Sequence, residues 1–385
     1  MKKKWLAMAV SAMLMTAALT GCSSTATKTN DIKVGVNMEI TGGVANYGKQ
    51  ALNGIQLAIK QANAAGGVNG KQITLVLADN KSEPAEATNA ITKLITQDKV
   101  VAVLGPAVSS NVLATVQVAE DNKIPVITPT GTNERITFDN GKLRNNVFRS
   151  CFIDPLQGTV MANFASKSLQ AKTAVIYIDS SSDYSKGLAQ SFQETFEKNG
   201  GKVIAKEAFL QKDQDFKATL TRIKSLNADV VFLPAYYEEV GKIVKQAREL
   251  GITLPFLGTD GWDDPKVVEI GSASALNNTF FSNHYSSQDN DPDVVKFIDA
   301  YKKEYNQEPS ALAALGYDAG LMLVDAMKRA NSTEPAKIRE ALEQTKNLKV
   351  STGLISVDAY HNPIKSAVVI EMKDGKQIFR EKINP

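Results

Sequence analysis

Segments with the pattern of β-strands alternate with segments of helical spacing from residue 32 onward. Residues 32–38 alternate as a strand does, and apolar side chains recur at helical spacing across residues 48–64. The alternation continues with strands predicted at 72–78, 100–104 and 124–127, and with helices predicted at 84–97 and in the segment that ends at Asp121. Repeated strand–helix–strand units require a parallel sheet with helices on both faces, which limits the chain to an α/β fold.

The series restarts after Arg149. Helices are predicted at 156–169, 184–198, 216–226 and 238–250, and strands at 172–178, 202–209, 229–233 and 255–257. A strand at 280–282 is followed by helices at 293–305, 311–330 and 335–343, and by two short strands at 366–372 and 377–381 that flank the turn Asp374-Gly375. The restart predicts a second doubly wound lobe and not an extension of the first.

The N-terminal residues have the composition of a secretory signal. Residues 2–4 are lysines, and the apolar run that follows ends at Leu19, which is too short to span a bilayer comfortably. The chain then continues Leu-Thr-Gly-Cys up to Cys22, which resembles the bacterial lipobox, whose cysteine is diacylated and becomes the new N-terminus. We therefore expect residues 1–22 to be a lipoprotein signal peptide ending at a lipidated Cys22, and residues 23–30 to be a polar tether. A plain signal peptide or a short membrane anchor is the alternative.

Charge and cysteine content exclude several kinds of protein. The formal net charge of the 385-residue chain is +3, and residues 2–4 account for all of it, so no nucleic-acid partner is expected. The chain has two cysteines, and a lipidated Cys22 would leave Cys151 without a partner. We therefore expect no disulfide in the fold. No second apolar stretch is long enough to cross a membrane.

Small polar and aromatic residues follow the predicted strands, where open α/β sheets bind their ligands. Ser109 follows the strand at 100–104 and leads into a helix. It is either the N-cap of that helix or a donor beside free N–H groups that attract a carboxylate. Comparable segments follow other strands, at 128–132 in the first lobe and at 179–184, 234–237 and 258–262 in the second. Their aromatic residues Tyr236, Tyr237 and Trp262 are either core residues or the walls of a pocket.

Short motifs along the whole chain occur in the order found in one family. They are Ile32-Lys33-Val34-Gly35, Thr41-Gly42-Gly43, Tyr47-Gly48, Ala64-Ala65-Gly66-Gly67-Val68-Asn69-Gly70, Arg149 with Asp154 and Gln157-Gly158, the set Asp179, Tyr184, Gly187 and Ala189, and Gly316-Tyr317-Asp318-Ala319. In these motifs the chain resembles the leucine/isoleucine/valine-binding proteins, which are type I solute-binding proteins of ABC transporters. The resemblance implies two doubly wound parallel-sheet lobes joined by a three-stranded hinge.

The resemblance also implies where the lobes begin and end. The N-terminal lobe would contain residues 31–151 plus 284–365, and the C-terminal lobe residues 152–283 plus 366–385. The chain would cross between them near Cys151, Asn283 and Lys365. In the N-terminal lobe, Ser109 and Thr132 would hold the carboxylate of an amino acid through hydroxyl and backbone N–H groups, and the carbonyl of Thr130 would accept from its ammonium.

The family pattern places the remaining ligand contacts mainly in the second lobe. Asp260 would be the countercharge of the ammonium, with Tyr184 and Tyr236 closing over the ligand. Tyr47 and Trp262 would line the side-chain end. Branched-chain binders have a glutamate where Asp260 stands, one methylene longer, which leaves the identity of the amino acid open.

Motifs of enzymes are incomplete or missing. Residues 43–50 nearly match a P-loop, but Gln50 stands where Mg²⁺ needs a serine or threonine. Neither the Gly-x-Ser-x-Gly nor the His-Glu-x-x-His motif occurs. The two histidines, His284 and His361, are expected at the surface or between the lobes. We expect no enzymatic activity and no cofactor.

Two acidic runs do not have the spacing of a calcium loop. Asp263-Asp264 and Asp289-Asn290-Asp291 lack both the loop spacing and a closing glutamate, so we expect solvated loop acids. No metal site is predicted.

Two functions remain open. In the first, the chain captures a branched-chain or similar aliphatic amino acid and docks on the permease subunits of an ABC transporter. In the second, the same module reports amino acids or amides to a signalling partner. Sensor versions usually continue into a membrane helix, whereas this chain ends at Pro385, which favours transport. We expect a lipid-anchored protein of the cell envelope that faces the periplasm or the exterior.

Overall fold

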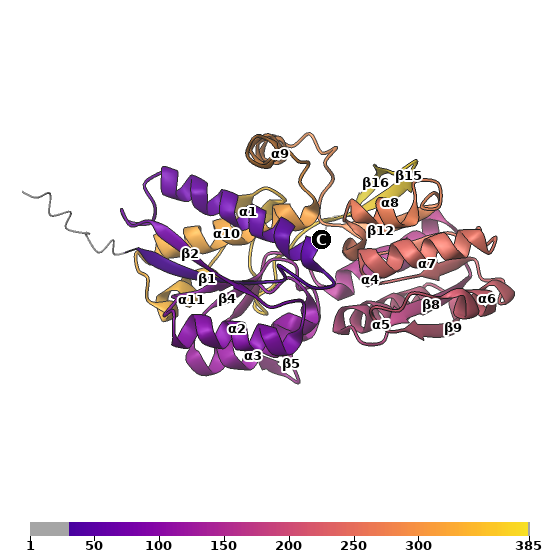
Figure 1. Ribbon diagram of the computed structural model, residues 1–385, viewed down its shortest axis with the longest axis horizontal. Helices are drawn as coiled ribbons and strands as arrows, with labels where there is room; N and C mark the ends of the chain where they lie inside the picture. The colour runs from indigo at the N-terminus through magenta and orange to yellow at the C-terminus, as the bar shows by residue number, and fades with distance from the viewer. Residues whose placement is uncertain (1–30, 384–385) are drawn as a thin grey trace, which may run out of the picture. The chain divides into compact units, whose positions relative to one another are not determined.

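The computed structural model describes residues 31–383 of the chain (Figure 1). The predicted signal peptide, the lipidation of Cys22 and the polar tether lie outside the described residues. None of the helices within 31–383 combines the length and the apolar character needed to cross a bilayer.

The first sheet has five parallel strands in the order β2-β1-β3-β4-β7. Its strands are β1 (Ile32–Met38), β2 (Ile73–Asp79), β3 (Val103–Leu104), β4 (Val126–Thr128) and β7 (Val147–Arg149). Successive residues of a strand point to opposite faces. In β7, Val147 therefore packs into the core on one face and Phe148 into the core on the other.

Helices cover both faces of this sheet (Figure 1). One face packs against α1 (Ala45–Ala64), α10 (Ala311–Ala330) and α11 (Pro335–Glu343). The other face packs against α2 (Pro84–Thr96) and α3 (Ser109–Asn122). A further helix, α9 (Pro292–Tyr305), lies on α1 and α10. This is the two-sided cover that the strand–helix alternation predicts.

The second sheet has seven strands in the order β16-β15-β12-β11-β10-β8-β9. They are β8 (Thr173–Asp179), β9 (Lys202–Phe209), β10 (Val230–Phe232), β11 (Phe256–Gly258), β12 (Thr279–Asn283), β15 (Ala367–Lys373) and β16 (Lys376–Ile383). The strands from β9 to β12 are parallel, whereas β15 and β16 are antiparallel to their neighbours. The parallel sheet predicted for this half is therefore extended by an antiparallel edge, an addition that is common in doubly wound folds.

In the second sheet, too, successive residues of a strand pack into two different cores. Val175 and Tyr177 of β8 pack with the helices α6 (Lys217–Ser225), α7 (Tyr237–Glu249) and α8 (Lys266–Gly271). Ala174 and Ile176 pack on the opposite face with α4 (Asp154–Asn163) and α5 (Asp183–Lys198). The two-residue period of β8 therefore separates two cores, as the sequence pattern indicates.

Three segments carry the chain between the sheets. They are residues 150–153 after β7, the residues that follow β12, and residues 356–366 before β15. The first and third segments are joined by the buried Lys365, whose ammonium donates to the carbonyl of Ser150 at 3.0 Å and lies 3.6 Å from a carboxylate oxygen of Asp318. These are the crossings expected near Cys151, Asn283 and Lys365. The proposed residue bounds of the lobes stay a prediction.

The long periodic elements match their predictions, and the short strands β3, β4, β10, β11 and β12 are also present where strands are predicted, with ends shifted by up to three residues. Helices α10 and α11 have the predicted bounds, whereas α1 begins at Ala45, three residues before the predicted start. The predicted helix at 156–169 begins at Asp154 and ends in a π-helical turn, Phe164–Ser168. The remaining short elements were not predicted: β5 (Phe138–Asp139), β6 (Lys142–Leu143), β7, α8, β13 (Leu348–Val350), β14 (Gly353–Ile355) and the 3₁₀ turns Glu134–Ile136 and Asp260–Trp262.

The predicted turn at Asp374-Gly375 is present and joins β15 to β16. Both residues have positive φ, +49° and +74°, which is the geometry of a type I′ hairpin turn. An Asp-Gly pair accepts this geometry because aspartate tolerates the left-handed region and glycine has no Cβ. The turn therefore fixes the register of the antiparallel edge.

Candidate functional site

A small cavity lies between the ends of strands from the two sheets. Its volume is about 20 Å³, which is room for about one water molecule. The lining residues are Tyr47, Ala107, Val108, Ser109, Thr130, Tyr184, Tyr236, Asp260, Gly261 and Leu312. They include all the predicted ligand residues except Thr132 and Trp262.

The first-sheet wall of this cavity is the start of α3. The N-cap residue of the helix is Val108, with extended backbone angles, and Ser109 is the first helical residue. The hydroxyl of Ser109 does not cap its own helix and instead accepts from the backbone N–H of Asn133 at 3.2 Å. The N-cap alternative for Ser109 is therefore wrong, and the hydroxyl stands beside the first-turn N–H groups that a helix leaves unpaired.

A buried glutamate that the sequence analysis did not identify holds this loop in place. The carboxylate of Glu39 accepts from the backbone N–H of Ala107 at 3.0 Å and of Val108 at 3.3 Å, and from the side-chain amide of Asn111 at 2.8 Å. Burial raises the pKa of Glu39, while these hydrogen bonds act in the opposite direction. Glu39 follows β1, so it is the first sheet that positions the start of α3.

A glycine lets the loop pass close to β1. Gly105 has φ +94°, and a Cβ there would lie 2.1 Å from the carbonyl oxygen of Asn37. Only glycine satisfies both conditions without strain. Gly105 is thus a structural requirement of the loop that leads to Ser109.

Of the two predicted threonines, Thr130 lines the cavity and Thr132 does not. The hydroxyl of Thr130 donates to the carbonyl of Ala107 at 2.7 Å and lines the cavity. Thr132 is fully buried and lies outside the lining. It lies beside Asp154, whose backbone N–H donates to the carbonyl of Thr132 at 2.9 Å. Burial raises the pKa of Asp154 well above its usual range, with the Thr132 hydroxyl opposing the rise.

The second-sheet wall is formed by Asp260 and two tyrosines. Tyr184 donates its hydroxyl to Oδ1 of Asp260 at 2.7 Å, and it accepts from the backbone N–H of Gly261 at 2.9 Å. The rings of Tyr184 and Tyr236 are stacked with centroids 5.0 Å apart. Burial raises the pKa of both tyrosines well above the usual range, so both are neutral phenols. The carboxylate and the aromatic face therefore lie on the same wall.

Tyr47 comes from α1 of the first sheet and reaches this wall. Its hydroxyl donates to the carbonyl of Gly261 and accepts from the backbone N–H of Tyr237 at 3.0 Å. Its ring meets Tyr236 edge to face at 5.5 Å. Tyr47 therefore closes the cavity across the two sheets in this structure.

Trp262 lies in the core and not in the lining. Its side chain is 1% exposed, its indole N–H donates to the carbonyl of Leu233 at 3.0 Å, and its ring stacks near Phe281. Trp262 was expected to be either a core residue or the wall of a pocket, and the structure favours the core residue. Its predicted contact with the ligand side chain has no support in the cavity geometry.

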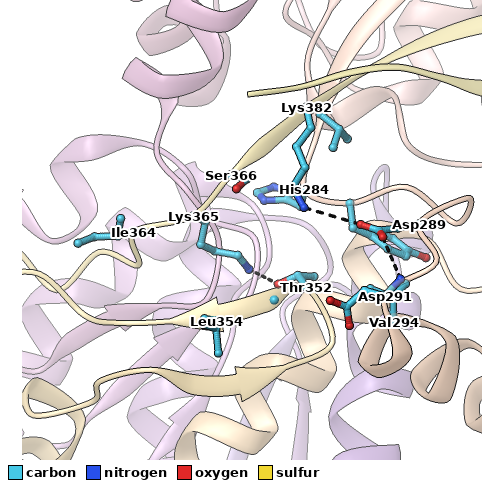
Figure 2. Close-up of a pocket in the computed structure, with 13 residues that line it drawn as sticks. His284, Asp289, Asp291, Val294, Thr352, Leu354, Ile364, Lys365, Ser366 and Lys382 are labelled. Atoms are coloured by element: carbon cyan, nitrogen blue, oxygen red, sulfur yellow. Dashed lines mark hydrogen bonds and ion pairs between the residues drawn. The ribbon is translucent and has the colours of Figure 1, made fainter. Parts of the chain in front are cut away.

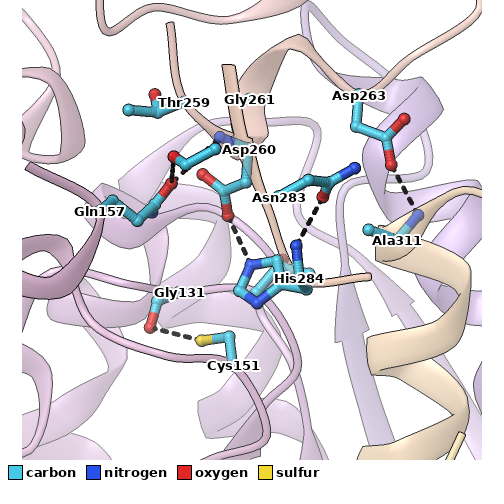
Figure 3. Close-up of polar contacts among 12 residues, drawn as sticks. Gly131, Cys151, Gln157, Thr259, Asp260, Gly261, Asp263, Asn283, His284 and Ala311 are labelled. Atoms are coloured by element: carbon cyan, nitrogen blue, oxygen red, sulfur yellow. Dashed lines mark hydrogen bonds and ion pairs between the residues drawn. The ribbon is translucent and has the colours of Figure 1, made fainter. Parts of the chain in front are cut away.

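His284 is the second functional residue that the sequence analysis missed. Its Nε2 lies 2.8 Å from Oδ2 of Asp260 (Figure 3). Its ring stacks on Phe152 with centroids 3.6 Å apart. The backbone N–H of Asp260 donates to the side-chain oxygen of Gln157 at 3.1 Å. Asp260 is therefore held through both carboxylate oxygens and its backbone, and no local sequence motif connects it to a histidine 24 residues away.

Expectations about other polar residues have different outcomes. His284 and His361 are both buried, and each lies in a segment that crosses between the sheets, which fits the interlobe alternative and not the surface one. The ring of His361 stacks on Phe148 of β7. Asp263 and Asp264 are buried and hydrogen-bonded, so they are not solvated loop acids. One partner of Asp264 is Gln50, the residue that breaks the P-loop pattern, at 2.8 Å.

Two further expectations concern the acidic run at 289–291 and the cysteine. Asp291 is exposed and caps α9, as a loop acid can. No group of three histidine, cysteine, aspartate or glutamate side chains within residues 31–383 is arranged to hold a metal ion. Cys151 is buried and its thiol is free.

Comparisons with known proteins agree with this fold. Residues 31–377 match the family model described as periplasmic binding protein. The leucine-, isoleucine-, valine-, threonine- and alanine-binding protein of Pseudomonas aeruginosa is 30% identical to this chain over 89% of each protein. The solved structure of the leucine-binding protein LivK of Thermotoga maritima is 40% identical and has a TM-score of 0.87, over 92% of this chain and 99% of that one.

A second solved structure is similar to the same degree. The branched-chain amino acid transporter substrate-binding protein LivJ of Streptococcus pneumoniae, in complex with isoleucine, is 40% identical, with a TM-score of 0.87 over 92% of this chain and 100% of that one. These relatives confirm the resemblance inferred from the motifs and the two-lobed α/β fold class. Proteins of this kind bind solutes for transporters and are not enzymes. The family therefore confirms the expectation that the chain has no enzymatic activity. The chain therefore belongs to the periplasmic binding protein family, as a type I member of the leucine/isoleucine/valine-binding kind.

Proposed function

We propose that the chain is the substrate-binding lipoprotein of an ABC transporter and captures an aliphatic amino acid of the branched-chain type between its two lobes. The observation that carries this proposal is the composition of the cavity wall. Among the described residues that line the cavity, Asp260 is the one charged side chain, Ser109 and Thr130 supply hydroxyls, and Val108 and Leu312 are apolar. One carboxylate, donors at a helix start and apolar walls complement a zwitterion with an apolar side chain.

The proposed roles follow from these positions. Asp260 pairs with the ligand ammonium, because an ammonium enclosed between the lobes has lost its water and needs a countercharge. Ser109 and the first-turn N–H groups of α3 hold the carboxylate. Tyr184 and Tyr236 enclose the ligand from the second lobe. The isoleucine bound by the S. pneumoniae relative supports the assignment to branched-chain amino acids.

A ligand screen tests the proposal on the protein from residue 23 onward. Isoleucine, leucine and valine at a hundred times their dissociation constants should each stabilise the fold by about 2.7 kcal/mol. Aspartate and lysine serve as controls for a charged side chain, and benzoate for a carboxylate without an ammonium. A thermal shift with benzoate and with none of the amino acids would contradict the proposal.

We further propose that the two lobes, with the bounds given by the resemblance, close on the ligand about the three crossings. A cavity of about 20 Å³ cannot admit an amino acid without the lobes moving apart. Contacts that such an opening would break include Gln50 with Asp264 at 2.8 Å, and Asn133 with the carbonyl of Asp183 at 2.8 Å. Hinge closure around a ligand is general for periplasmic binding proteins.

Small-angle scattering measures this motion. We expect the radius of gyration to decrease when isoleucine is added, because the bound ligand bridges the lobes and favours the closed state. The Asp260→Ala variant provides the control, since it should scatter identically with and without isoleucine. Identical wild-type profiles at saturating ligand would remove the hinge mechanism and leave the amino-acid site to be judged by the ligand screen.

We propose that Cys22 carries the lipid that holds the protein at the membrane, because a small-residue box precedes it and a polar tether follows. Cys22→Ala should move the protein from the membrane fraction to the soluble fraction. Cys151→Ala is the matched control, since it removes the other cysteine and should leave the protein with the membrane. Membrane fractionation of both variants checks this, and an unchanged distribution of Cys22→Ala would argue against a lipid anchor.

A further inference from the structure

We infer that His284 is a positioning residue for Asp260, and that it makes amino-acid binding weaken in acid through a proton taken up at the hinge. The inference rests on the proposed function, because it requires Asp260 to pair with the ligand ammonium. It adds to the proposed site a residue, His284, that would not contact the ligand. It also adds a dependence of the amino-acid affinity on pH, which follows from the position of His284.

The contacts of Asp260 show how its carboxylate is oriented. Oδ2 lies 2.8 Å from Nε2 of His284, and Oδ1 accepts from the hydroxyl of Tyr184 at 2.7 Å. Figure 3 shows the carboxylate directed at the imidazole ring. With one donor on each oxygen, the carboxylate has a fixed plane and still has lone pairs left for an ammonium.

The surroundings of the ring favour its neutral form. His284 is 4% exposed and stacks on Phe152, and its Nδ1 has no hydrogen-bond partner within the described residues. The neutral tautomer with hydrogen on Nε2 donates to Asp260 and leaves Nδ1 as a bare acceptor. A protonated ring would bury an unpaired N–H group as well as a charge, which costs more. Burial accordingly lowers the pKa of His284, and the hydrogen bond to Asp260 opposes this only in part.

His284 also lines a second cavity, which we call the hinge cavity. It has a volume of about 310 Å³ and is lined by residues of two crossings, including His284, Lys365 and Ser366 (Figure 2). This volume holds several water molecules, so a proton can reach the ring without passing through the ligand cavity. The charged groups that face the ring or this cavity are Asp260, Asp263, Asp289, Asp291, Lys365 and Lys382.

The direction of the pH effect follows from competition for one carboxylate. An imidazolium at His284 and the ligand ammonium are both cations paired with Asp260, so each disfavours the other. Because the pKa of His284 is lowered from 6.5, the ring is neutral at neutral pH and affinity is insensitive to pH there. Affinity should then fall as the pH drops below 6.5 and through the lowered pKa, and bound ligand should lower this pKa further.

Two variants separate orientation from titration. His284→Gln keeps a neutral donor near the Nε2 position but cannot be protonated in this range. His284→Leu has no donor and should bind isoleucine about tenfold to a hundredfold more weakly at neutral pH, because a hydrogen bond to a charged group is lost. Calorimetry with isoleucine between about pH 7.5 and pH 5 should show a steeper acid decline for the wild type than for His284→Gln. Any decline shared by both proteins does not come from His284.

A direct titration of the ring tests the inference without relying on a variant that must bind. The chain has two histidines, so its ring carbon NMR signals are few, and His284→Gln assigns the one that disappears. We expect the His284 signal to titrate below 6.5 and to shift further down when isoleucine is present. A normal His284 titration that isoleucine leaves unchanged overturns the inference even if isoleucine binds. Failure of every amino acid to bind at neutral pH overturns the proposed function and the inference together.

Discussion

Asp260→Ala is expected to abolish measurable amino-acid binding while the protein stays folded. Removing one partner of a desolvated charged pair typically costs about 2–5 kcal/mol, which corresponds to roughly thirtyfold to several thousandfold in affinity. The loss should be of this size because Asp260 is the only carboxylate in the described lining of the cavity and is 7% exposed. Ser109→Ala should cost only about 1 kcal/mol, since backbone N–H groups at the start of α3 still hold the ligand carboxylate.

Calorimetry with isoleucine on both variants measures this order, with circular dichroism as the folding control. Asp260→Asn keeps the volume of the side chain and removes the charge, so it should lose nearly as much affinity as Asp260→Ala. Glu269→Gln neutralises an exposed acid of α8 and should bind as the wild type does. Wild-type affinity in Asp260→Ala would mean that the ligand is not an amino acid held by this carboxylate.

Lys365→Met should lower the free energy of unfolding by about 3–5 kcal/mol, because it breaks a buried ion pair and leaves one partner behind. The ammonium of Lys365 is buried and contacts Ser150, Thr352 and Asp318. The substitution leaves the fully buried Asp318 without its cation. Ser351 still donates to Asp318 through its N–H at 2.8 Å and its hydroxyl at 2.6 Å. The loss in the free energy of unfolding should therefore lie near the lower end of this range.

Urea denaturation of the protein from residue 23 onward measures this difference. Lys349→Met is the matched control, because Lys349 is an exposed lysine whose ion pair with Asp293 spans 4.0 Å. Exposed pairs of this kind contribute at most about 1 kcal/mol. Equal midpoints and slopes of the urea denaturation curves of the two variants would show that Lys365 does not stabilise the crossing segments.

Much of the fold was predictable because its long elements bury regular faces. The twenty residues of α10 were placed to the residue, since Ala311–Ala330 lies between the cap Ser310 and the left-handed Asn331. Several elements of two or three residues were missed, because β5, β6 and β13 carry too few side chains to show a period. The equally short β3, β4, β10 and β11 were predicted because each lies in an apolar run. Such short strands depend on tertiary partners that a local pattern does not contain.

The candidate site was predicted partly from strand ends and partly from the family resemblance, which alone supplied Tyr47 of α1. Ser109, Thr130 and Asp260 stand directly after strands or in the loops that continue them, so the topology brought them to one cavity. Glu39 and His284 were missed because their roles depend on partners distant in sequence: Ala107 for the first and Asp260 for the second. Trp262 was placed at the ligand by the family resemblance, and an aromatic residue after a strand has no local feature that distinguishes a core position from a pocket wall.

The buried thiol of Cys151 makes this protein a convenient starting point for a fluorescent reporter. Burial raises the pKa of Cys151 to about 12, so almost no thiolate is present at neutral pH to attack a maleimide dye. A chain that starts after Cys22 contains no other cysteine. One new cysteine at an exposed position of α5 such as Lys186, at the edge where the lobes meet, would therefore take up dye alone, and its emission would follow amino-acid concentration without any change to the hinge.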